Sequence, residues 1–326
     1  MLGAVALLVW AVVLGVLGPV ALRRAGWPTR SPRLGLLVWQ AASFSFVAAL
    51  VLGGLALAVP ATVLSGGLSD LLTNCIMAVR DAYRTPAGAG AAGAGLILAS
   101  GATGRVSWCL SHGLQQAARR RRDHAQRLAL VARRDETLGV LVVTHPALRA
   151  YCLPGRGATI VVTSATLAAL HPDELAAVLA HERAHVRARH HLVVAAAAGL
   201  ARAFPKVPLL RDAAVAIPAL VEMAADDSAS RCTDRNRVAT ALLALAGTAA
   251  PAAALAAGGP GAFRRVQRLL RPSAPLSLVA TTAACGLAVT LLLAPAIAAV
   301  APAWAAGPMN DCSMRMVEVY GATASR

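Results

Sequence analysis

The chain has few charged and few aromatic residues. Of its 326 residues only 14% are charged and 4% are aromatic, whereas 57% are hydrophobic. Typical globular domains contain about 25% charged residues. The composition therefore excludes a disordered chain and argues against a single soluble domain. A mean hydropathy of +0.62 fits a protein that exposes much of its surface to lipid.

Acidic residues are scarce, and Lys206 is the only lysine. The chain has 15 acidic and 31 basic residues, which gives a net charge of +16. Such a surplus is typical of proteins that bind nucleic acid or an anionic membrane surface. Because the arginines gather at the ends of apolar segments, we expect the bilayer as the partner and no nucleic acid.

The six cysteines include no C-x-x-C pair. This spacing indicates neither a zinc ribbon nor a disulfide framework, and most of the cysteines are expected to be small buried hydrophobes. Cys75 and Cys312 are both expected outside the membrane, but the sequence does not decide whether they pair.

Four apolar segments are candidate transmembrane helices: 2–22, 34–59, 87–110 and 276–301. Each is long enough to cross about 30 Å of hydrocarbon. Arginines follow the first segment instead of preceding it, which favours a retained anchor over a cleaved signal peptide. The short loop after it carries Arg23, Arg24, Arg30 and Arg33, so the positive-inside rule makes it cytoplasmic.

The segment 87–110 is rich in alanine and glycine, and a flexible linker also fits it. Counting it as a span places three arginine clusters on one side of the membrane: the loop after the first segment, the run Arg119–Arg122, and the group Arg264, Arg265, Arg268 and Arg271. The predicted organisation is a membrane region over 1–111, a cytoplasmic domain over 112–275, the fourth span 276–301 and an outside tail over 302–326. Residues 60–86 would lie outside, either as a helix on the membrane surface or as a packed extracytoplasmic helix.

A strong helix signal contains the chemistry-bearing residues. Pro172 suits the first helical position, and the two acids after it suit the positive end of the helix dipole. Residues four apart share a helix face, so His181 and His185 can bind one metal ion. Glu182 can then reach a water molecule at that ion. This is the H-E-x-x-H arrangement of zinc peptidases.

A catalytic zinc ion usually has a third protein ligand and one open position. Glu222 and Asp226 share a face of a second predicted helix, in which Pro218 is a start or a kink. We predict that Glu222 is the third ligand and that Asp226 orients a ligand histidine from the second coordination shell. An ordinary solvated acid pair is the alternative.

Segments before the zinc helix have the composition of β-strands. Residues 138–143 are rich in β-formers, and 151–163 suggest two strands joined by a turn at 154–157. An edge strand beside the zinc helix could pair with an extended peptide, although an ordinary hairpin that caps the core also fits. The expected fold class is α+β, mostly helical, with a small antiparallel sheet.

The helix with its downstream E-x-x-x-D pair resembles the gluzincin membrane metallopeptidases. Two types are similar, the BlaR/MecR antirepressor type and the HtpX/CAAX-endopeptidase type. Both share the hairpin that begins Tyr151-Cys-Leu-Pro-Gly and ends Ile160-Val-Val-Thr. The order of three spans, zinc domain and fourth span is more similar to the BlaR/MecR type.

The resemblance implies that His181, His185 and Glu222 bind one Zn²⁺ per chain and that Glu182 is the general base. It also implies a membrane-embedded zinc endopeptidase whose substrate is a protein such as a transcriptional repressor or a membrane protein. The chain departs from the BlaR/MecR type after its last span. There Ser313-Met-Arg-Met lacks the lysine of an S-x-x-K acylation motif, which argues against β-lactam sensing.

A second hypothesis is a zinc-binding membrane sensor or scaffold with little or no proteolysis, against which an intact Glu182 argues. His190 and His191 follow the motif and fit polar residues at a helix end better than a second coordination shell. The sequence does not identify the oxyanion-stabilising donor, for which Tyr151, Arg231 and Arg235 are candidates.

Overall fold

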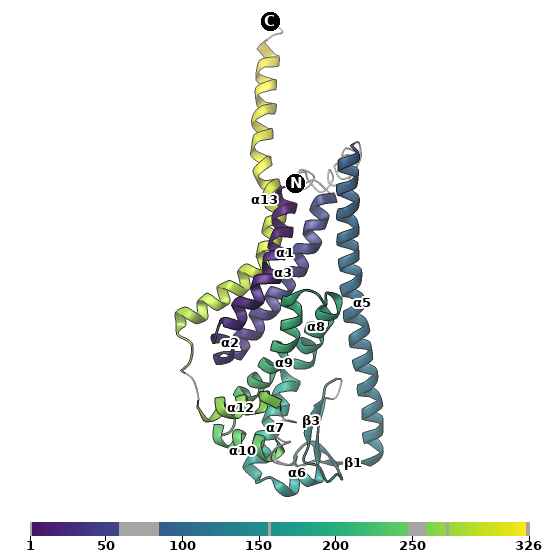
Figure 1. Cartoon of the computed structure of the whole chain (residues 1–326), viewed down its shortest axis with the longest axis vertical. Helices are drawn as coiled ribbons and strands as arrows, with labels where there is room; N and C mark the ends of the chain where they lie inside the picture. The colour runs from purple at the N-terminus through teal and green to yellow at the C-terminus, as the bar shows by residue number, and fades with distance from the viewer. Residues whose placement is uncertain (1, 59–84, 156–157, 247–258, 272–273, 324–326) are drawn as a thin grey trace.

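The computed structural model describes residues 2–58, 85–155, 158–246, 259–271 and 274–323 (Figure 1). As expected, the described chain is mostly helical, with one small sheet. In chain order its elements are α1 (Leu2–Arg24), α2 (Trp27–Arg30), α3 (Pro32–Ala58), α5 (Pro86–Val131), β1 (Ala132–Asp135), β2 (Val140–Val143), β3 (Ala150–Leu153), β4 (Thr159–Thr163), α6 (Ser164–Ala169), α7 (Pro172–Arg187), α8 (His190–Ala203), α9 (Pro208–Ala229), α10 (Arg235–Ala246), α12 (Gly259–Leu270) and α13 (Leu278–Thr323).

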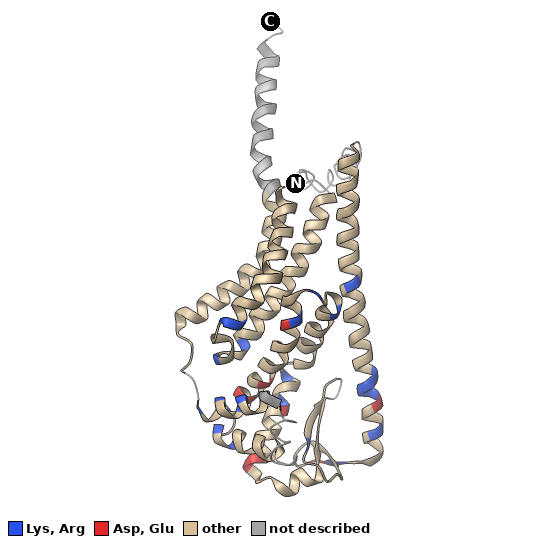
Figure 2. Ribbon diagram, viewed as in Figure 1, with Lys and Arg blue, Asp and Glu red and all other residues tan. Residues whose placement is uncertain are grey.

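Three described helices are long and apolar enough to cross a membrane: Leu2–Arg24, Pro32–Ala58 and Leu278–Ala301. Large apolar side chains on α1 and α13 point outward, among them Val12 and Ile297 with 65% and 62% of their surface exposed. A bilayer would cover such a surface. Figure 2 shows that the described charged residues gather at the end of the molecule that holds the sheet, away from the outer halves of these helices.

The predicted third span, 87–110, forms the first half of α5 and is not among these three helices. It packs against α3 at unusually close range. A Cβ atom at Gly95 would lie 2.7 Å from the Cβ of Leu57, and one at Gly54 would lie 2.8 Å from the carbonyl oxygen of Gly95. Small residues permit such contacts between helices in lipid. That 87–110 crosses a membrane stays a prediction, and most of 60–86, with Cys75, lies outside the described residues.

The largest apolar core joins the middle of the chain to the apolar helices. Trp39 and Phe46 of α3 share this core with Leu200 of α8 and Leu209 of α9. The chain after α8 adds Phe204, whose ring meets Phe46 edge to face with a centroid distance of 5.7 Å. Helices α8 and α9, which follow the H-E-x-x-H motif in the chain, are therefore packed directly on the candidate membrane helices. Helix α5 runs unbroken across the predicted boundary at 111/112.

The sheet has the strand order β1-β2-β4-β3. The predicted hairpin forms between β3 and β4, but the expectation of an antiparallel sheet is wrong at its centre, where β2 and β4 run parallel. The most buried strand, β4, is one of the two inner strands. The apolar side chains of Ile160, Val161 and Val162 are buried on both faces of the sheet, which favours an inner position. The half-exposed β3 is left at the edge. Strand β1 was not predicted, because its sequence Ala-Arg-Arg-Asp has no β-forming pattern.

Helix α7 begins where the sequence predicts. The carboxylate of Glu174 accepts a hydrogen bond from the backbone N–H of His171 at 3.0 Å, which closes the first turn. Leu179 packs against Val140, Ile160 and Val162 of the sheet. This contact fixes the rotation of α7, so that its histidine face turns toward α9.

Candidate metal centre

His181 and His185 lie on one face of α7 and point at the same place. Their Nε2 atoms are 3.0 Å apart, as expected for residues separated by one helical turn. Both side chains are largely buried, with 13% and 14% of their surface exposed.

Glu222 reaches the same place from α9. Its Oε2 lies 3.5 Å from Nε2 of His181, and its Oε1 lies 3.5 Å from Nε2 of His185. Helix α9 begins at Pro208, so Pro218 is not its start but lies inside it. Because Glu222 and Asp226 are four residues apart on this helix, both face α7.

The three side chains fit a zinc ion. One donor atom from each lies within 4.8 Å of the others. In a tetrahedral site with Zn–N bonds of about 2.05 Å, two ligand atoms are about 3.3 Å apart. The separations of 3.0 and 3.5 Å bracket this value. Two imidazoles and one carboxylate are also the donor set of catalytic zinc sites that keep a fourth position open.

The outer nitrogens of both histidines have partners. Nδ1 of His181 lies 3.0 Å from Oδ1 of Asp226. Since an ionised carboxylate only accepts, this nitrogen carries the proton and Nε2 is free to bind a metal. Nδ1 of His185 lies 3.1 Å from Nδ1 of His190, the first residue of α8. His190 therefore contacts a candidate ligand and is not a solvated polar residue at a helix end.

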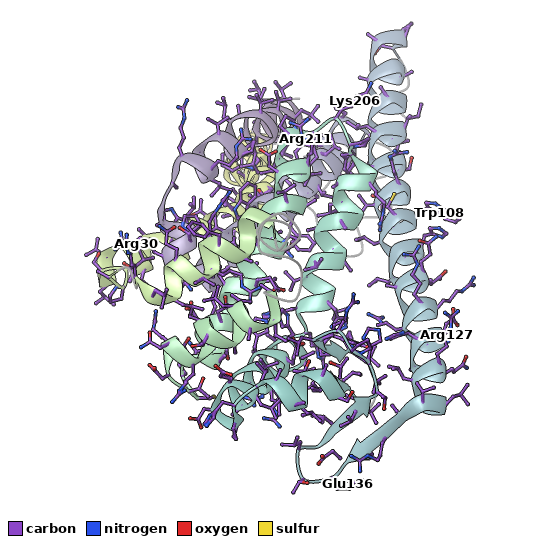
Figure 3. The ribbon with its side chains drawn as sticks, turned by 60° about the horizontal axis from the view of Figure 1, so that its bottom comes forward. Arg30, Trp108, Arg127, Glu136, Lys206 and Arg211 are labelled. Carbon is purple, nitrogen blue, oxygen red and sulfur yellow. The ribbon has the colours of Figure 1, made fainter. Side chains whose placement is uncertain are left out.

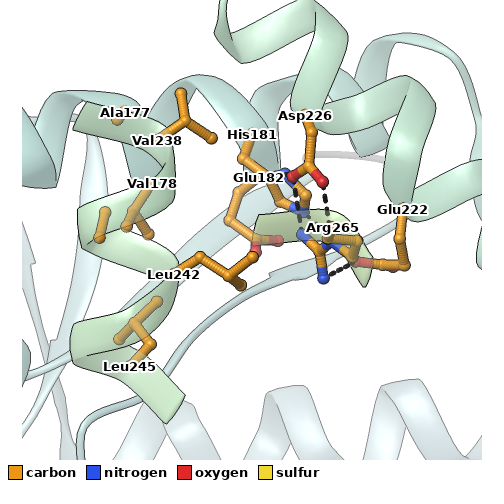
Figure 4. Close-up of a pocket in the computed structure, with 11 residues that line it drawn as sticks. Ala177, Val178, His181, Glu182, Glu222, Asp226, Val238, Leu242, Leu245 and Arg265 are labelled. Atoms are coloured by element: carbon orange, nitrogen blue, oxygen red, sulfur yellow. Dashed lines mark hydrogen bonds and ion pairs between the residues drawn. The ribbon is translucent and has the colours of Figure 1, made fainter. Parts of the chain in front are cut away.

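Arg265 of α12 completes the cluster, and the sequence analysis missed its role. Its Nε and Nη2 donate hydrogen bonds to the two carboxylate oxygens of Asp226 at 2.8 and 2.7 Å. Its Nη1 lies 2.9 Å from Oε2 of Glu222, as Figure 4 shows. In the sequence, Arg265 belongs to an arginine cluster that predicts the cytoplasmic side of the membrane. The scarcity of acids was the available signal, because the adjacent pair Asp226–Asp227 needs basic partners.

The pKa values of His181 and His185 are shifted in opposite directions. Burial alone would lower the pKa of His181, but its hydrogen bonds with Asp226 and Glu222 raise it to about 9. Burial lowers the pKa of His185 to about 4. Two nitrogen lone pairs cannot face each other at 3.0 Å, so a proton or a metal ion lies between the two Nε2 atoms.

Glu182 lies beside these donors and lines a cavity of about 180 Å³ with His181, Glu222 and Arg265. Burial raises the pKa of its carboxyl, an effect partly opposed by the charge of His181 and reinforced by Glu222. Cys152 of the edge strand β3 also interacts with this carboxylate. A carboxylate whose pKa is raised toward neutrality is suited to accept and return a proton.

The three candidates for an oxyanion donor lie elsewhere. The cavity beside Glu182 is not lined by Arg231, Arg235 or Tyr151. The hydroxyl of Tyr151 lies 2.8 Å from Nε2 of His124 instead. Among the described residues, Arg265 is the one cationic side chain other than histidine in the lining.

The comparison with protein families agrees with this geometry. Residues 115–210 match the model of Peptidase family M48. No curated protein and no solved structure matches the chain. The matched range includes His181, Glu182 and His185 and ends before Glu222, Asp226 and Arg265, and members of the family are zinc metalloproteases. The centre of this chain is therefore similar to the metallopeptidases of family M48, a relationship that covers less than half of its length.

Proposed function

We propose that the protein is a membrane-anchored zinc metalloendopeptidase of the gluzincin type. One observation carries the proposal: His181, His185 and Glu222 converge on one point, with Glu182 beside it. The match to Peptidase family M48 and the three apolar helices support it. Each chain would hold one Zn²⁺.

Each side chain of the centre would have a separate role in peptide hydrolysis. A bound zinc ion would supply Lewis acidity to the scissile carbonyl and to water. Glu182 takes the proton of the attacking water and returns it to the leaving amine. Asp226 holds the tautomer of His181, and Arg265 holds Asp226 and Glu222 in place. Arg265 also keeps a positive charge at the edge of the cavity.

The substrate would lie along the edge strand β3. A groove of about 630 Å³ is lined by Cys152 and Pro154, by His185 and Glu222, and by apolar residues of α8 such as Val194. An extended peptide could add to the free edge of β3 and reach the metal centre. The cavity beside Glu182 is closed by Val238, Leu242 and Leu245 of α10, so it would receive an apolar substrate side chain.

We further propose the BlaR/MecR antirepressor type, with the HtpX/CAAX type as runner-up, because of the order of the apolar segments along the chain. Arg268, three residues after Arg265 of the metal centre, donates a hydrogen bond to the carbonyl oxygen of Thr29, so the metal centre lies toward the arginine-bearing end of α1 and α3. By the positive-inside rule this end is cytoplasmic. The substrate would then be a transcriptional repressor or a membrane protein with a cytoplasmic segment.

The test uses the full-length protein, purified in detergent and loaded with zinc. Glu182→Gln should keep one zinc ion per chain by elemental analysis and lose at least about a hundredfold in cleavage of a quenched fluorescent peptide library. Glu136→Gln removes the same carboxylate in an exposed turn, where Glu136 pairs with Arg134, and should cleave normally.

Equal cleavage by the Glu182→Gln protein and the wild type would refute the assigned base. Stoichiometric zinc without cleavage in either protein, together with unchanged proteomes in cells that carry each form, would instead support a zinc-binding sensor or scaffold.

A further inference from the structure

Another pocket, of about 340 Å³, shares no lining residue with the cavity beside Glu182. We call it the arginine pocket, and its lining consists of Arg30, Asp227, Ser230, Arg231, Arg235, Arg268 and Pro275. These residues come from α2, α9, the turn after α9, α10, α12 and the segment before α13, so only the folded chain brings them together. Neither the candidate ligands nor Glu182 line it.

The arginine pocket carries uncompensated positive charge. Asp227 is its one acidic residue among the described lining, and Arg268 neutralises it with hydrogen bonds of 2.7 and 2.8 Å to its two carboxylate oxygens. Neither Arg231 nor Arg235 forms an ion pair with an acid in the described part of the chain, and Arg235 is half-buried. Guanidinium groups that have no carboxylate partner of their own, as those of Arg231 and Arg235, are suited to bind an anion.

The pocket lies close to the place where α1 ends and where α3 and α13 begin. Arg30 belongs to the short α2 between α1 and α3 (Figure 3). Its Nη2 donates a hydrogen bond to the carbonyl oxygen of Ala274, just before α13. From the other side, Nε of Arg268 donates to the carbonyl oxygen of Thr29 at 2.8 Å. Trp27 in the same loop is the kind of residue that marks a membrane interface.

We propose that the arginine pocket binds the phosphate of an anionic phospholipid from the adjacent leaflet. The proposal requires that α1, α3 and α13 cross a bilayer, but it does not depend on peptidase activity. The pocket is within the usual size range of ligand sites. Arginines placed at the cytoplasmic surface meet the leaflet that is richest in anionic lipids. A free phosphate would offer the same oxygens without the acyl chains that hold it at this depth.

A bound headgroup would act on the helix that organises the metal centre. Arg268 faces the arginine pocket, and Arg265, three residues earlier on α12, binds Asp226 and Glu222. The lipid would therefore steady α12 between the membrane loop and the metal centre.

The experiment measures lipid binding to the full-length protein in a neutral detergent, by native mass spectrometry. Phosphatidylglycerol is the probe, phosphatidylcholine the zwitterionic reference, and inorganic phosphate the soluble competitor. The wild type should retain one phosphatidylglycerol in preference to phosphatidylcholine. The double variant Arg231→Gln/Arg235→Gln should bind it roughly 10- to 30-fold more weakly, since each arginine near a membrane surface contributes on the order of 1 kcal/mol.

The matched control is Arg237→Gln/Arg264→Gln, which removes the same charge from α10 and α12. Both of these arginines are exposed and lie outside the pocket lining. If the first double variant does not fold, the single variant Arg30→Gln, with Arg24→Gln as its control, replaces it. Equal weakening in variant and control, no preference for phosphatidylglycerol, or displacement of the lipid by equimolar inorganic phosphate would each overturn the proposal.

Discussion

Arg265 and Asp226 form two hydrogen bonds, of 2.8 and 2.7 Å, although 39 residues separate them in the chain. Asp226 is almost fully buried, with 2% of its side chain exposed. Burial alone would raise the pKa of its carboxyl, but Arg265 and His181 lower it to about 2. Asp226 is therefore an acceptor with a fixed orientation, and this is what allows it to hold the tautomer of His181.

Arg265→Lys tests whether the planar guanidinium is needed. Lysine keeps the charge but cannot hold Asp226 through two parallel hydrogen bonds. We expect zinc affinity to fall about 10- to 100-fold, as for other residues that orient metal ligands. Competition with a zinc-chelating dye measures it. Arg264→Lys, an exposed neighbour on α12, should leave affinity unchanged, and unchanged affinity in Arg265→Lys as well would remove the role assigned here.

Asp226→Asn tests whether Asp226 supports zinc binding by orienting His181 or only through its negative charge. Asparagine has nearly the same shape but weakens the charge-assisted hydrogen bond, so zinc affinity should fall about 10- to 100-fold. Asp227→Asn is the matched control, because Asp227 binds Arg268 and not a candidate ligand. A similar loss of affinity in the two variants would mean that long-range charge, and not orientation, explains the result.

His190→Ala removes the partner of the outer nitrogen of His185. The contact between two neutral imidazoles at 3.1 Å is weaker than the charge-assisted one to Asp226. We expect zinc affinity to fall by up to about tenfold. His191→Ala is the natural comparison, since the buried Nδ1 of His191 has no hydrogen-bond partner among the described residues. Isothermal titration calorimetry at constant pH should show that His191→Ala binds zinc like the wild type. A greater loss of zinc affinity in His191→Ala than in His190→Ala would contradict the structure.

Gly95→Ala tests the close packing of α3 against α5. The added methyl group would lie 2.7 Å from the Cβ of Leu57, so the helices must move apart. Overpacking of this kind costs about 1–3 kcal/mol and should lower the thermal midpoint in detergent by several degrees. Gly93→Ala adds the same group at a position where no atom of the described residues lies within 4 Å. That variant should be neutral or slightly stabilised, because alanine favours helix by up to about 1 kcal/mol. Equal midpoints for the two variants would contradict the contact.

Local patterns predicted the elements that depend on nearby residues. The α7 helix followed from Pro172 and its acidic first turn, and the pairing of its histidines followed from helical spacing. Three apolar helices of membrane-spanning length followed from length and composition. The hairpin of β3 and β4 followed from its turn residues and β-formers. Each of these signals acts within a few residues or along one continuous segment.

Contacts between distant segments required the folded chain. The sequence placed Arg265 and Arg268 in a cluster at a membrane boundary, but their side chains turn inward to Asp226 and Asp227. The parallel pairing of β2 with β4 depends on which strand the core must cover from both sides.

The sequence by itself therefore determined the candidate metal-binding face of α7, the membrane-length helices and the kind of chemistry that we propose. Tertiary structure alone decided what surrounds that face: Arg265, His190, the edge position of β3 and the arginine pocket. The physical reason is the separation along the chain of the residues that interact. Helical periodicity and hydropathy are set by neighbouring residues, whereas an ion pair between α12 and α9 depends on how separate helices pack around a shared core.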